Sequence, residues 1–397
     1  MKKVMIFYAA YGGGHLSAAR SIKENLETNY NDVDVKLVDC MEYVNKVVNK
    51  VTTKAYSEMA KKAPQTWGKV YWKSQTGPLA HISTTSNKVL SIKLNTLLKD
   101  FGPDIIISTH PFGTQMCAYL KKLGKLDAKI ATVMTDYAPH DQWLVLNKYV
   151  DYYFVSHDEM KRKLHEKGIS NEKIYATGIP LSQKFLLKYD KTEILQRISL
   201  SPDKKTVLFF GGGEYGLGKS KTLKIFKTFV ENNNIQIVAI SGKNPKMKED
   251  FQCLVDELDK KDSVKVLEYT DKVPELMSIS DLVVTKPGGL TTTESLASGL
   301  PIVVINPIPG QEEENAAYLE NNKVAIWIKN NDDIEQILND LFSNPSKMQE
   351  MKIRARLLAK KNSTKDICKI ILNRFCLKTG SFLYFIILFF LLKLLLK

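Results

Sequence analysis

The residues from Thr285 to Asn315 combine a glycine turn with polar side chains of the kinds that bind phosphate and sugar groups. A short apolar run, Asp281–Val284, precedes the turn and is typical of a buried strand. Pro287-Gly288-Gly289 then lead into a predicted helix that ends at Gly299, and Ile302–Ile305 is the next predicted strand. A glycine turn before a helix N-terminus presents unpaired backbone N–H groups and the positive end of the helix dipole. The stretch therefore predicts a site for an anionic group such as phosphate.

Acidic and amide side chains accompany this predicted anion site. Glu294 falls in the first turn of the predicted helix, where its carboxylate can accept hydrogen bonds from both hydroxyls of a ribose. Gln311, Glu312 and Asn315 follow the next strand on one loop, and their amide and carboxylate groups can bind the hydroxyls of a sugar. An ordinary strand–helix–strand unit with a polar loop explains the same residues. The stretch alone leaves both interpretations open.

A histidine follows the first glycine turn of the chain. The predicted strand Val4–Ala9 leads to Gly12-Gly13-Gly14-His15, so His15 lies at a helix start on the carboxyl edge of a sheet, where ligands bind. The helix dipole is expected to lower the pKa of this imidazole, which keeps it neutral and able to accept a proton. Asp136 ends a later strand, Ile130–Thr135, on the same edge and is placed to orient or assist His15. A histidine that only caps or packs against the turn is the alternative.

Predicted strands and helices alternate in two series, and each series has a glycine turn after its first strand. Residues 181–204 form a linker between the series, and residues 41–99 lack one clean period and are interpreted as helices with a mobile segment. The alternation predicts an α/β protein with two doubly wound domains that face each other across a cleft. A single large α/β domain is the alternative. The predicted strands are Val4–Ala9, Val33–Val38, Asp104–Ser108, Ile130–Thr135, Tyr152–Ser156 and Lys173–Ala176, then Thr206–Phe210, Ile235–Ile240, Val264–Leu267, Asp281–Val284 and Ile302–Ile305.

Two shorter glycine motifs compete for the second turn. Gly211, Gly213 and Gly216 have the spacing of a dinucleotide fingerprint, but the next strand ends in Ser241-Gly242 and offers no acid for a ribose. The residues from Gly213 to Ser220 match a phosphate-binding loop of nucleotide hydrolases, but no apolar strand ending in Asp is present to bind its magnesium ion. Neither motif accounts for the first half of the chain.

The charge of the chain is concentrated in two regions. The 397 residues carry a formal net charge of +14, which predicts an anionic partner, either nucleic acid or an anionic membrane. Residues 42–100 contain ten lysines and three acids, and residues 343–397 contain twelve basic residues and two acids. The remainder is nearly neutral. The five cysteines form no CxxC pair and are typical of reduced cysteines in a cytosolic protein, and no zinc site is expected.

In combination and in this order, the motifs resemble those of glycosyltransferase family 28, which has the GT-B fold. The chain is most similar to the branch that contains monogalactosyldiacylglycerol synthase and processive diacylglycerol β-glucosyltransferase. The resemblance covers the chain up to about Leu377 and depends on Gly12–His15, Thr109-His110-Pro111, Thr135-Asp136-Tyr137 with His140 and Trp143, Thr177–Pro180, and Thr285–Asn315.

The resemblance implies a separate role for each of the successive domains of the chain. It implies an acceptor-binding Rossmann-like domain over residues 1–185, a UDP-sugar-binding Rossmann-like domain over 186–345, and a basic helical region over 346–380. His15 is the expected catalytic base, with Asp136 as its partner. No metal or cofactor is expected, because helix N-termini stabilise the departing UDP. The expected donor-binding residues are Gly14, Gly212, Gly213, Pro287, Gly288, Gly289, Leu290, Thr291, Glu294, Gln311, Glu312 and Asn315, and the expected acceptor-side residues are His110, Tyr137, His140 and Trp143.

The last residues, 381–397, form an apolar tail that is not part of the family pattern. As a helix the tail is about 25 Å long, which is shorter than the roughly 30 Å hydrocarbon core of a bilayer. We interpret it as a membrane-inserted or interfacial anchor, with the basic residues before it lying against anionic lipid.

These expectations together predict an inverting transferase that moves a glucose or galactose from a UDP-sugar to the hydroxyl of 1,2-diacylglycerol. The predicted partners are the UDP-sugar, diacylglycerol and an anionic membrane, on the cytoplasmic side of the cell membrane, and no nucleic acid. One alternative is a transferase that adds N-acetylglucosamine to a lipid-linked peptidoglycan precursor. Another is a non-catalytic protein that binds anionic membrane or nucleic acid through the same basic regions.

Overall fold

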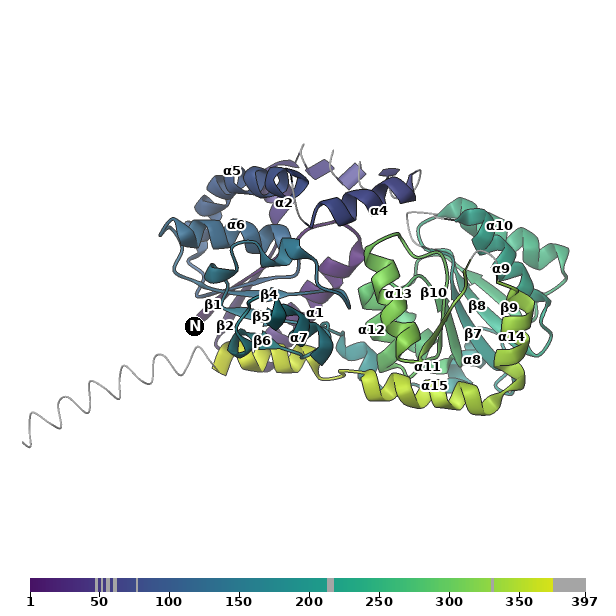
Figure 1. Ribbon diagram of the computed structural model, residues 1–397. Coiled ribbons are helices and arrows are strands. Elements are labelled where there is room, and N and C mark those ends of the chain that lie inside the picture. The colour runs from purple at the N-terminus through teal and green to yellow at the C-terminus, as the bar shows by residue number, and fades with distance from the viewer. Residues whose placement is uncertain are drawn as a thin grey trace, which may run out of the picture.

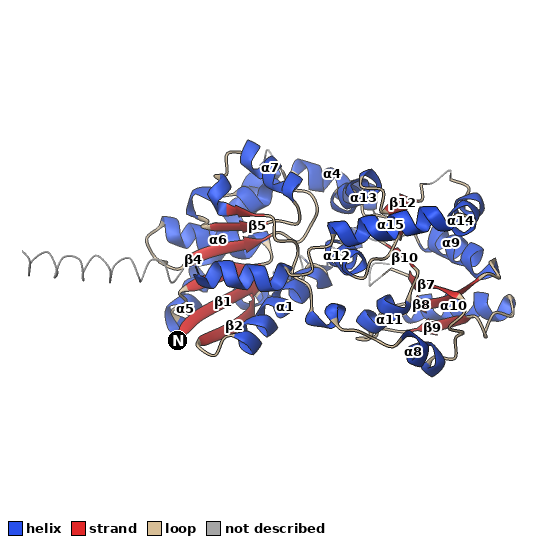
Figure 2. Cartoon of the chain, turned by 90° about the horizontal axis from the view of Figure 1, so that it is seen from below, coloured by secondary structure: helices blue, strands red, loops and turns tan. Residues whose placement is uncertain are grey.

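The computed structural model describes residues 1–46, 49–50, 53–54, 58–59, 63–75, 78–212, 218–329 and 332–373. Within these residues the chain forms two parallel sheets of six strands each. Figure 1 shows the two sheets in separate lobes, the first half of the chain in one lobe and most of the second half in the other. Helices cover both faces of each sheet (Figure 2).

The first sheet has the strand order β2-β1-β3-β4-β5-β6, which is the flavodoxin-like doubly wound order. Its strands form because short β-branched runs are apolar on both faces, as in β3, where every residue is buried. The strands are β1 (Lys2–Tyr8), β2 (Val33–Asp39), β3 (Ile105–Ser108), β4 (Lys129–Val133), β5 (Tyr152–Phe154) and β6 (Ile174–Tyr175).

The second sheet has the order β12-β11-β10-β7-β8-β9, which is the order of the dinucleotide-binding Rossmann fold. The predicted fold class, two doubly wound α/β domains, is therefore confirmed. The short last strand was missed from the sequence, because only three residues pair and two of them are half-buried. The strands are β7 (Lys205–Phe210), β8 (Ile235–Ile240), β9 (Val264–Leu267), β10 (Leu282–Thr285), β11 (Ile302–Val304) and β12 (Ala325–Trp327).

The helices connect these strands by crossovers. The first lobe contains α1 (Gly13–Asn29), α2 (Cys40–Val44), α4 (Pro64–Lys73), α5 (Pro78–Phe101), α6 (Pro111–Lys122) and α7 (Asp158–Glu166). The second contains α8 (Lys191–Arg197), α9 (Lys219–Glu231), α10 (Pro245–Glu257), α11 (Val273–Ile279), α12 (Gly289–Ala297), α13 (Gln311–Asn321), α14 (Ile334–Ser343) and α15 (Pro345–Leu358). Helix α8 lies in the stretch that the sequence predicted as linker.

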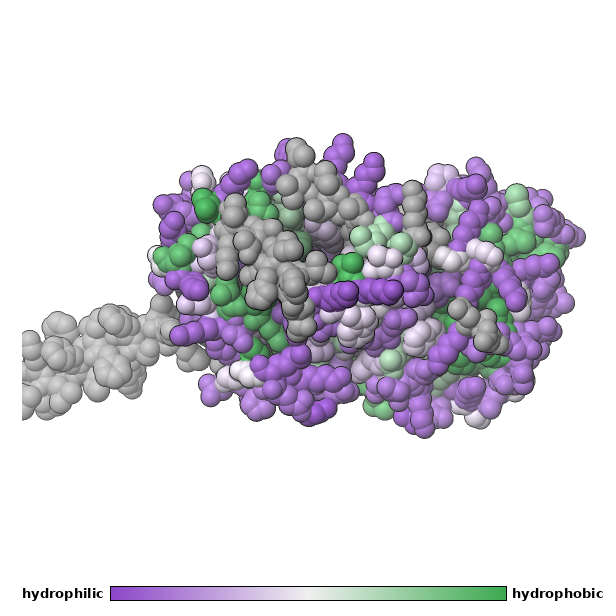
Figure 3. Space-filling model, turned by 45° about the horizontal axis from the view of Figure 1, so that its top comes forward, coloured by the Kyte–Doolittle hydropathy of each residue, from purple (hydrophilic) through white to green (hydrophobic). Residues whose placement is uncertain are grey.

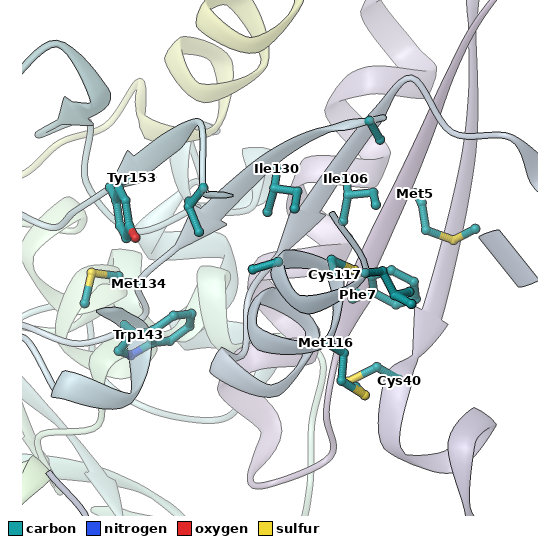
Figure 4. Close-up of a cluster of buried hydrophobic side chains, with 14 of the residues drawn as sticks. Met5, Phe7, Cys40, Ile106, Met116, Cys117, Ile130, Met134, Trp143 and Tyr153 are labelled. Atoms are coloured by element: carbon teal, nitrogen blue, oxygen red, sulfur yellow. The ribbon is translucent and has the colours of Figure 1, made fainter. Parts of the chain in front are cut away.

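The core of the first lobe fills both faces of its sheet. On one face, β1, β3 and β4 pack against α5 and α6, and Figure 4 shows this cluster, with Trp143 beside Met134 and Tyr153. Trp143 is only 4% exposed, so its indole contributes to this core. The sequence predicted an acceptor-side position for Trp143, whereas the structure places its side chain in the core.

The chain crosses between the lobes twice, and the two crossings lie side by side. Residues 178–181 leave the first lobe, and residues 359–362 return after α15. The Thr364 hydroxyl accepts a hydrogen bond from the Leu181 N–H and donates one to the Leu181 carbonyl, both at 2.8 Å. A last helix, residues 363–373, then packs Ile367 and Ile371 against the first sheet. The yellow ribbon in Figure 1 follows this return.

Some predicted features lie outside the described residues. They are Gly213, parts of the predicted mobile segment, and the apolar tail 381–397. Among the described residues no helix is both long and apolar enough to cross a membrane.

Thr364→Val is expected to destabilise the protein, because it leaves a buried N–H and a buried carbonyl of Leu181 without partners. The expected cost is about 1–3 kcal/mol of unfolding free energy. Chemical denaturation followed by circular dichroism measures it. The control is Thr228→Val, since the Thr228 hydroxyl bonds only the Lys224 carbonyl of its own helix. Equal stability of the two variants would contradict this role of the crossing.

Candidate active site

The carboxyl ends of the two sheets face each other between the lobes. In the first sheet the strand order reverses between β1 and β3, and His15 and Thr109 follow these two strands. In the second sheet it reverses between β7 and β10, which are followed by Gly212 and by Gly288. Ligands of doubly wound sheets bind at such reversal points. The structure therefore brings the turns at Gly212 and Gly288 and the predicted base, His15, to one place.

The N-termini of α1 and α12 approach each other across this junction. A Cβ atom on Gly14 would lie 3.3 Å from the Leu290 side chain. Helix α12 begins at Gly289, with Gly288 as its N-cap, so Glu294 lies in the second turn and not in the first. Both helix N-termini carry unpaired N–H groups and positive dipole ends. Their convergence creates a region that favours negative charge.

Gly289 is the point of closest approach between the lobes. A Cβ atom added there would lie 1.8 Å from the Thr135 carbonyl oxygen. No side chain fits at that distance, so only glycine permits the helix N-terminus to touch the end of β4. The approach places Asp136 against the second lobe.

His15 is held in one tautomer by the backbone. Its Nδ1 atom lies 2.6 Å from the Thr109 carbonyl oxygen, which can only accept a hydrogen bond, so Nδ1 carries the proton. The Thr135 hydroxyl lies 3.1 Å from the same nitrogen, and the Thr109 hydroxyl donates to the His15 carbonyl at 2.8 Å. In the neutral ring, Nε2 then has a free lone pair. The geometry is that of an oriented base.

The pKa of His15 lies below its usual range chiefly because the ring is buried. The nearby Asp136 carboxylate and the bond to Thr109 oppose this shift. The sequence also predicted a lowered pKa for His15, but it named the helix dipole as the cause. In the structure the main cause is desolvation. The edge of the His15 ring contacts His110, with ring centroids 4.6 Å apart.

Asp136 is a buried carboxylate held by the opposite lobe. Gln311 donates to Asp136 Oδ2 at 2.5 Å, and Asn315 donates to Oδ1 at 3.3 Å. Burial raises the pKa of Asp136, while the bond from Gln311 and the charge of His15 lower it. The structure shows no direct hydrogen bond from Asp136 to His15 among the described residues, so Asp136 acts on His15 through its electric field.

Asn315 and Gln311 therefore connect the two lobes in this structure. Asn315 is fully buried, accepts from the Tyr137 N–H at 2.8 Å, and donates to the Pro287 carbonyl at 2.9 Å as well as to Asp136. Both of its amide hydrogens are thus in use. The sequence predicted that Asn315 would bind sugar hydroxyls, but the geometry gives it a structural role between the lobes.

Glu294 remains a candidate for binding a ligand. Glu294 is half-buried, and desolvation raises the pKa of its carboxyl to about 8. Hydrogen bonds from a ligand would stabilise the ionised form of this desolvated carboxyl. The predicted binding to a ribose diol would supply two.

A lysine that the sequence prediction missed lies beside the second glycine turn. Gly212 has a φ of +85°, and a Cβ atom there would lie 3.4 Å from Lys286 Cε. Burial lowers the pKa of Lys286, and the neighbouring Glu312 raises it. Glu312 itself accepts from the Ile308 N–H at 2.7 Å. Lys286 directly follows β10, at the reversal point of the sheet, and this position could have identified it from the sequence. The lysine places a cation where phosphates are expected.

The other predicted residues have structural contacts. His110 caps α6 through Nδ1 and stacks on Tyr11. The Tyr137 hydroxyl lies 2.9 Å from the Thr293 hydroxyl in the second lobe. His140 caps the short helix that contains Trp143. Thr291 is half-buried on α12, and its carbonyl accepts from the Ser295 hydroxyl. In the described part of the chain no group of three or more His, Cys, Asp and Glu side chains is arranged to hold a metal ion.

Two Rossmann-like domains whose glycine turns face an oriented histidine define a glycosyltransferase of the GT-B class. A solved structure of MurG from Acinetobacter baumannii supports the fold, with a TM-score of 0.63 over 94% of this chain and 100% of that chain at 15% identity. Family models match both lobes: monogalactosyldiacylglycerol (MGDG) synthase over residues 15–181 and glycosyl transferases group 1 over residues 190–358.

Curated relatives narrow the class to one family. The processive diacylglycerol beta-glucosyltransferase of Bacillus licheniformis is 30% identical over 94% of this chain and 95% of its own length. The enzyme of the same name from Bacillus subtilis is 31% identical, also over 94% and 95%. The chain belongs to the family of the processive diacylglycerol beta-glucosyltransferases.

Gly289→Ala is expected to force the lobes apart, because the added methyl group would overlap the Thr135 carbonyl. Turnover is expected to fall by roughly a hundredfold or more, since misplacement by about 1 Å has effects of that size. Small-angle scattering should show an expanded molecule. Gly288→Ala is the matched control for the scattering measurement, because its Cβ atom would meet nothing closer than Glu312 Oε1 at 3.9 Å. A compact Gly289→Ala variant would show that the contact is dispensable.

Proposed function

We propose that this chain transfers a hexose from a UDP-sugar to the hydroxyl of 1,2-diacylglycerol, with inversion at the anomeric carbon. The observation that carries the proposal is the oriented, neutral His15 at the junction of two glycine turns, in a chain of this family. The names of both relatives specify glucosyl transfer, which favours glucose over galactose. The likeness to MurG supports the fold alone and gives no weight to a peptidoglycan precursor as acceptor.

His15 is the proposed base. Its Nε2 lone pair would take the proton of the diacylglycerol hydroxyl as that oxygen bonds to the anomeric carbon. The bond from this carbon to the UDP oxygen breaks, and its electron pair leaves with UDP. The Thr109 carbonyl holds the ring in the required tautomer, and the Asp136 charge stabilises the imidazolium that forms.

The second lobe is the proposed donor site. The N-termini of α1 and α12 and the Lys286 ammonium face the region where the diphosphate charge would develop. Glu294 would bind the ribose, and Glu312 would lie near the sugar. Because backbone dipoles and a lysine supply the positive charge, we propose that the reaction needs no metal ion.

We also propose that the enzyme works at an anionic membrane, on its cytoplasmic side. The segment 42–100 of the first lobe contains ten lysines and three acids, and it also exposes Tyr43, Trp72 and Ile92. Aromatic rings suit the headgroup layer and lysines suit lipid phosphates. Figure 3 shows the face that contains the top of the molecule, where hydrophilic and hydrophobic residues lie side by side.

A product assay tests the proposed function. The full chain is incubated with diacylglycerol vesicles and with UDP-glucose, UDP-galactose or UDP-N-acetylglucosamine, and the lipid products are weighed by mass spectrometry. A hexosyl-diacylglycerol formed in excess EDTA supports the proposal, including its independence of metal. No lipid product from either UDP-hexose, or a product only after metal is restored, would contradict it.

His15→Ala is expected to lower turnover by about 10²–10⁴-fold and to leave UDP affinity nearly unchanged, because a base acts in the transition state. Because burial lowers the pKa of His15, the wild-type enzyme should keep its activity as pH falls through 6.5 and lose it only below. Steady-state kinetics and calorimetry measure both effects. His165→Gln, on the surface helix α7, is the control, and near-normal turnover of His15→Ala would exclude the base assignment.

UDP affinity is expected to rise with pH up to about 8, because ribose hydroxyls donate to the ionised Glu294, which is mostly protonated at pH 7 in the free protein. The rise should approach tenfold per pH unit and level off above the pKa, by about pH 8.5. Calorimetry from pH 6.5 to 8.5 measures the profile. Glu294→Gln should abolish the slope, and equal slopes in both proteins would rule out Glu294 as the source.

Binding to vesicles is expected to depend on phosphatidylglycerol and to weaken with salt when residues 381–397 are deleted. Each basic residue near the surface contributes about 1 kcal/mol, and salt screens this attraction. The intact chain should stay bound at high salt, since burial of apolar surface is insensitive to screening. Flotation of both proteins across a salt series decides: if the truncated protein never floats on anionic vesicles, the basic regions are not the membrane surface.

A further inference from the structure

Helix α4 belongs to the first lobe by sequence but packs against the second. A Cβ atom on Gly68 would lie 2.8 Å from Pro309 Cβ, and one on Gly310 would lie 2.5 Å from the Tyr71 ring. The side chain of Tyr71 therefore lies directly on the loop that precedes α13. Helices α4 and α13 are neighbours in both Figure 1 and Figure 2.

Tyr71 is bonded to both lobes at once. Its hydroxyl donates to Glu314 Oε2 of α13 at 2.7 Å. Its carbonyl lies 3.2 Å from Nε2 of His140 in the first lobe, and its ring lies against the His140 ring at a centroid distance of 4.6 Å. Gln142 adds a hydrogen bond to the Ser74 carbonyl at 2.9 Å. The end of α4 is thus fixed to the first lobe while its tyrosine reaches the second.

The first five residues of α13 include the two amides that hold Asp136. Gln311 and Asn315 lie on either side of Glu314 in sequence, so a shift of this end of the helix moves all three side chains together. Burial raises the pKa of Glu314, and the bond from Tyr71 opposes that shift. A partly buried carboxylate with one tyrosine donor is a charge-assisted contact, which is stronger than a neutral hydrogen bond.

We propose that Tyr71 is a positioning residue for the transfer reaction: through Glu314 and Gly310 it sets the first turn of α13, and so places Asp136 beside His15. Tyr71 is not one of the residues proposed to bind the donor or to take the proton. Its effect on turnover comes from the alignment of the two lobes. This inference rests on the proposed function, because turnover is one of its readouts.

Tyr71→Phe is the main test, since it removes one oxygen and keeps the ring on Gly310. We expect kcat to fall about ten- to a hundredfold, the effect of losing a hydrogen bond to a charged group. UDP affinity should change less than twofold, because the glycine turns and Glu294 are untouched. Glu314→Gln should retain most of the activity, since its amide oxygen still accepts from the tyrosine. Tyr269→Phe, on an exposed ring of the second lobe, is the matched control.

A second measurement needs no substrate. Hydrogen exchange of the amides at residues 311–316 should be faster in Tyr71→Phe than in the wild type, and unchanged in Tyr269→Phe. If the wild-type chain makes no glycolipid, the proposed function fails, but the exchange result still tests the contact of α4 with α13.

The kinetic and exchange results also separate positioning from simple packing. A structural role alone would lower the melting temperature and leave kcat of the folded enzyme unchanged. Tyr71→Phe combined with Glu314→Ala should be no slower than Glu314→Ala alone, because both remove the same contact. Unchanged kcat in Tyr71→Phe, additive losses in the double variant, or unchanged exchange at residues 311–316 would each overturn the proposal.

Discussion

The buried carboxylate of Asp136 is the constraint on which the arrangement of the two lobes depends. A carboxylate in such a place is costly unless its oxygens are hydrogen-bonded, and here both oxygens receive amide N–H groups from the opposite lobe. The same contact requires a glycine at 289, because the end of β4 and the start of α12 touch. Contact between the lobes is therefore a condition for satisfying the carboxylate, and the hydrogen bonds to the carboxylate in turn hold the lobes in contact.

Burial shifts the pKa values of the titratable groups in this site. The imidazoles of His15 and His110 have lowered pKa values, and the carboxyls of Asp136, Glu294 and Glu312 have raised ones, in each case mainly because water is excluded. All of these shifts favour the neutral forms. Positive charge for an anionic substrate comes from the helix dipoles and from Lys286 in this site.

The sequence predicted the strands, the two glycine turns and the residues at their ends, because these follow from local hydrophobic patterns and from backbone geometry. It did not predict how side chains pair between the lobes. Tyr71 and Glu314 are 243 residues apart in sequence, and the local sequence around either residue does not predict the contact between them. The same holds for Asn315, whose amide faces Tyr137 and Asp136, and for Trp143, whose aromatic ring suited an acceptor surface as well as a core. Pairing of this kind is set by the tertiary fold.

In Figure 1 the return crossing after α15 lies at the bottom of the molecule, and α4 lies at the top. The reciprocal bonds between Thr364 and Leu181 join the crossings to each other, so both chain connections between the lobes lie at one place. If one lobe rotates relative to the other about the crossings, residues far from the crossings move farther than residues close to them. A small rotation of this kind would therefore displace Tyr71 from Glu314 more than it displaces Thr364 from Leu181.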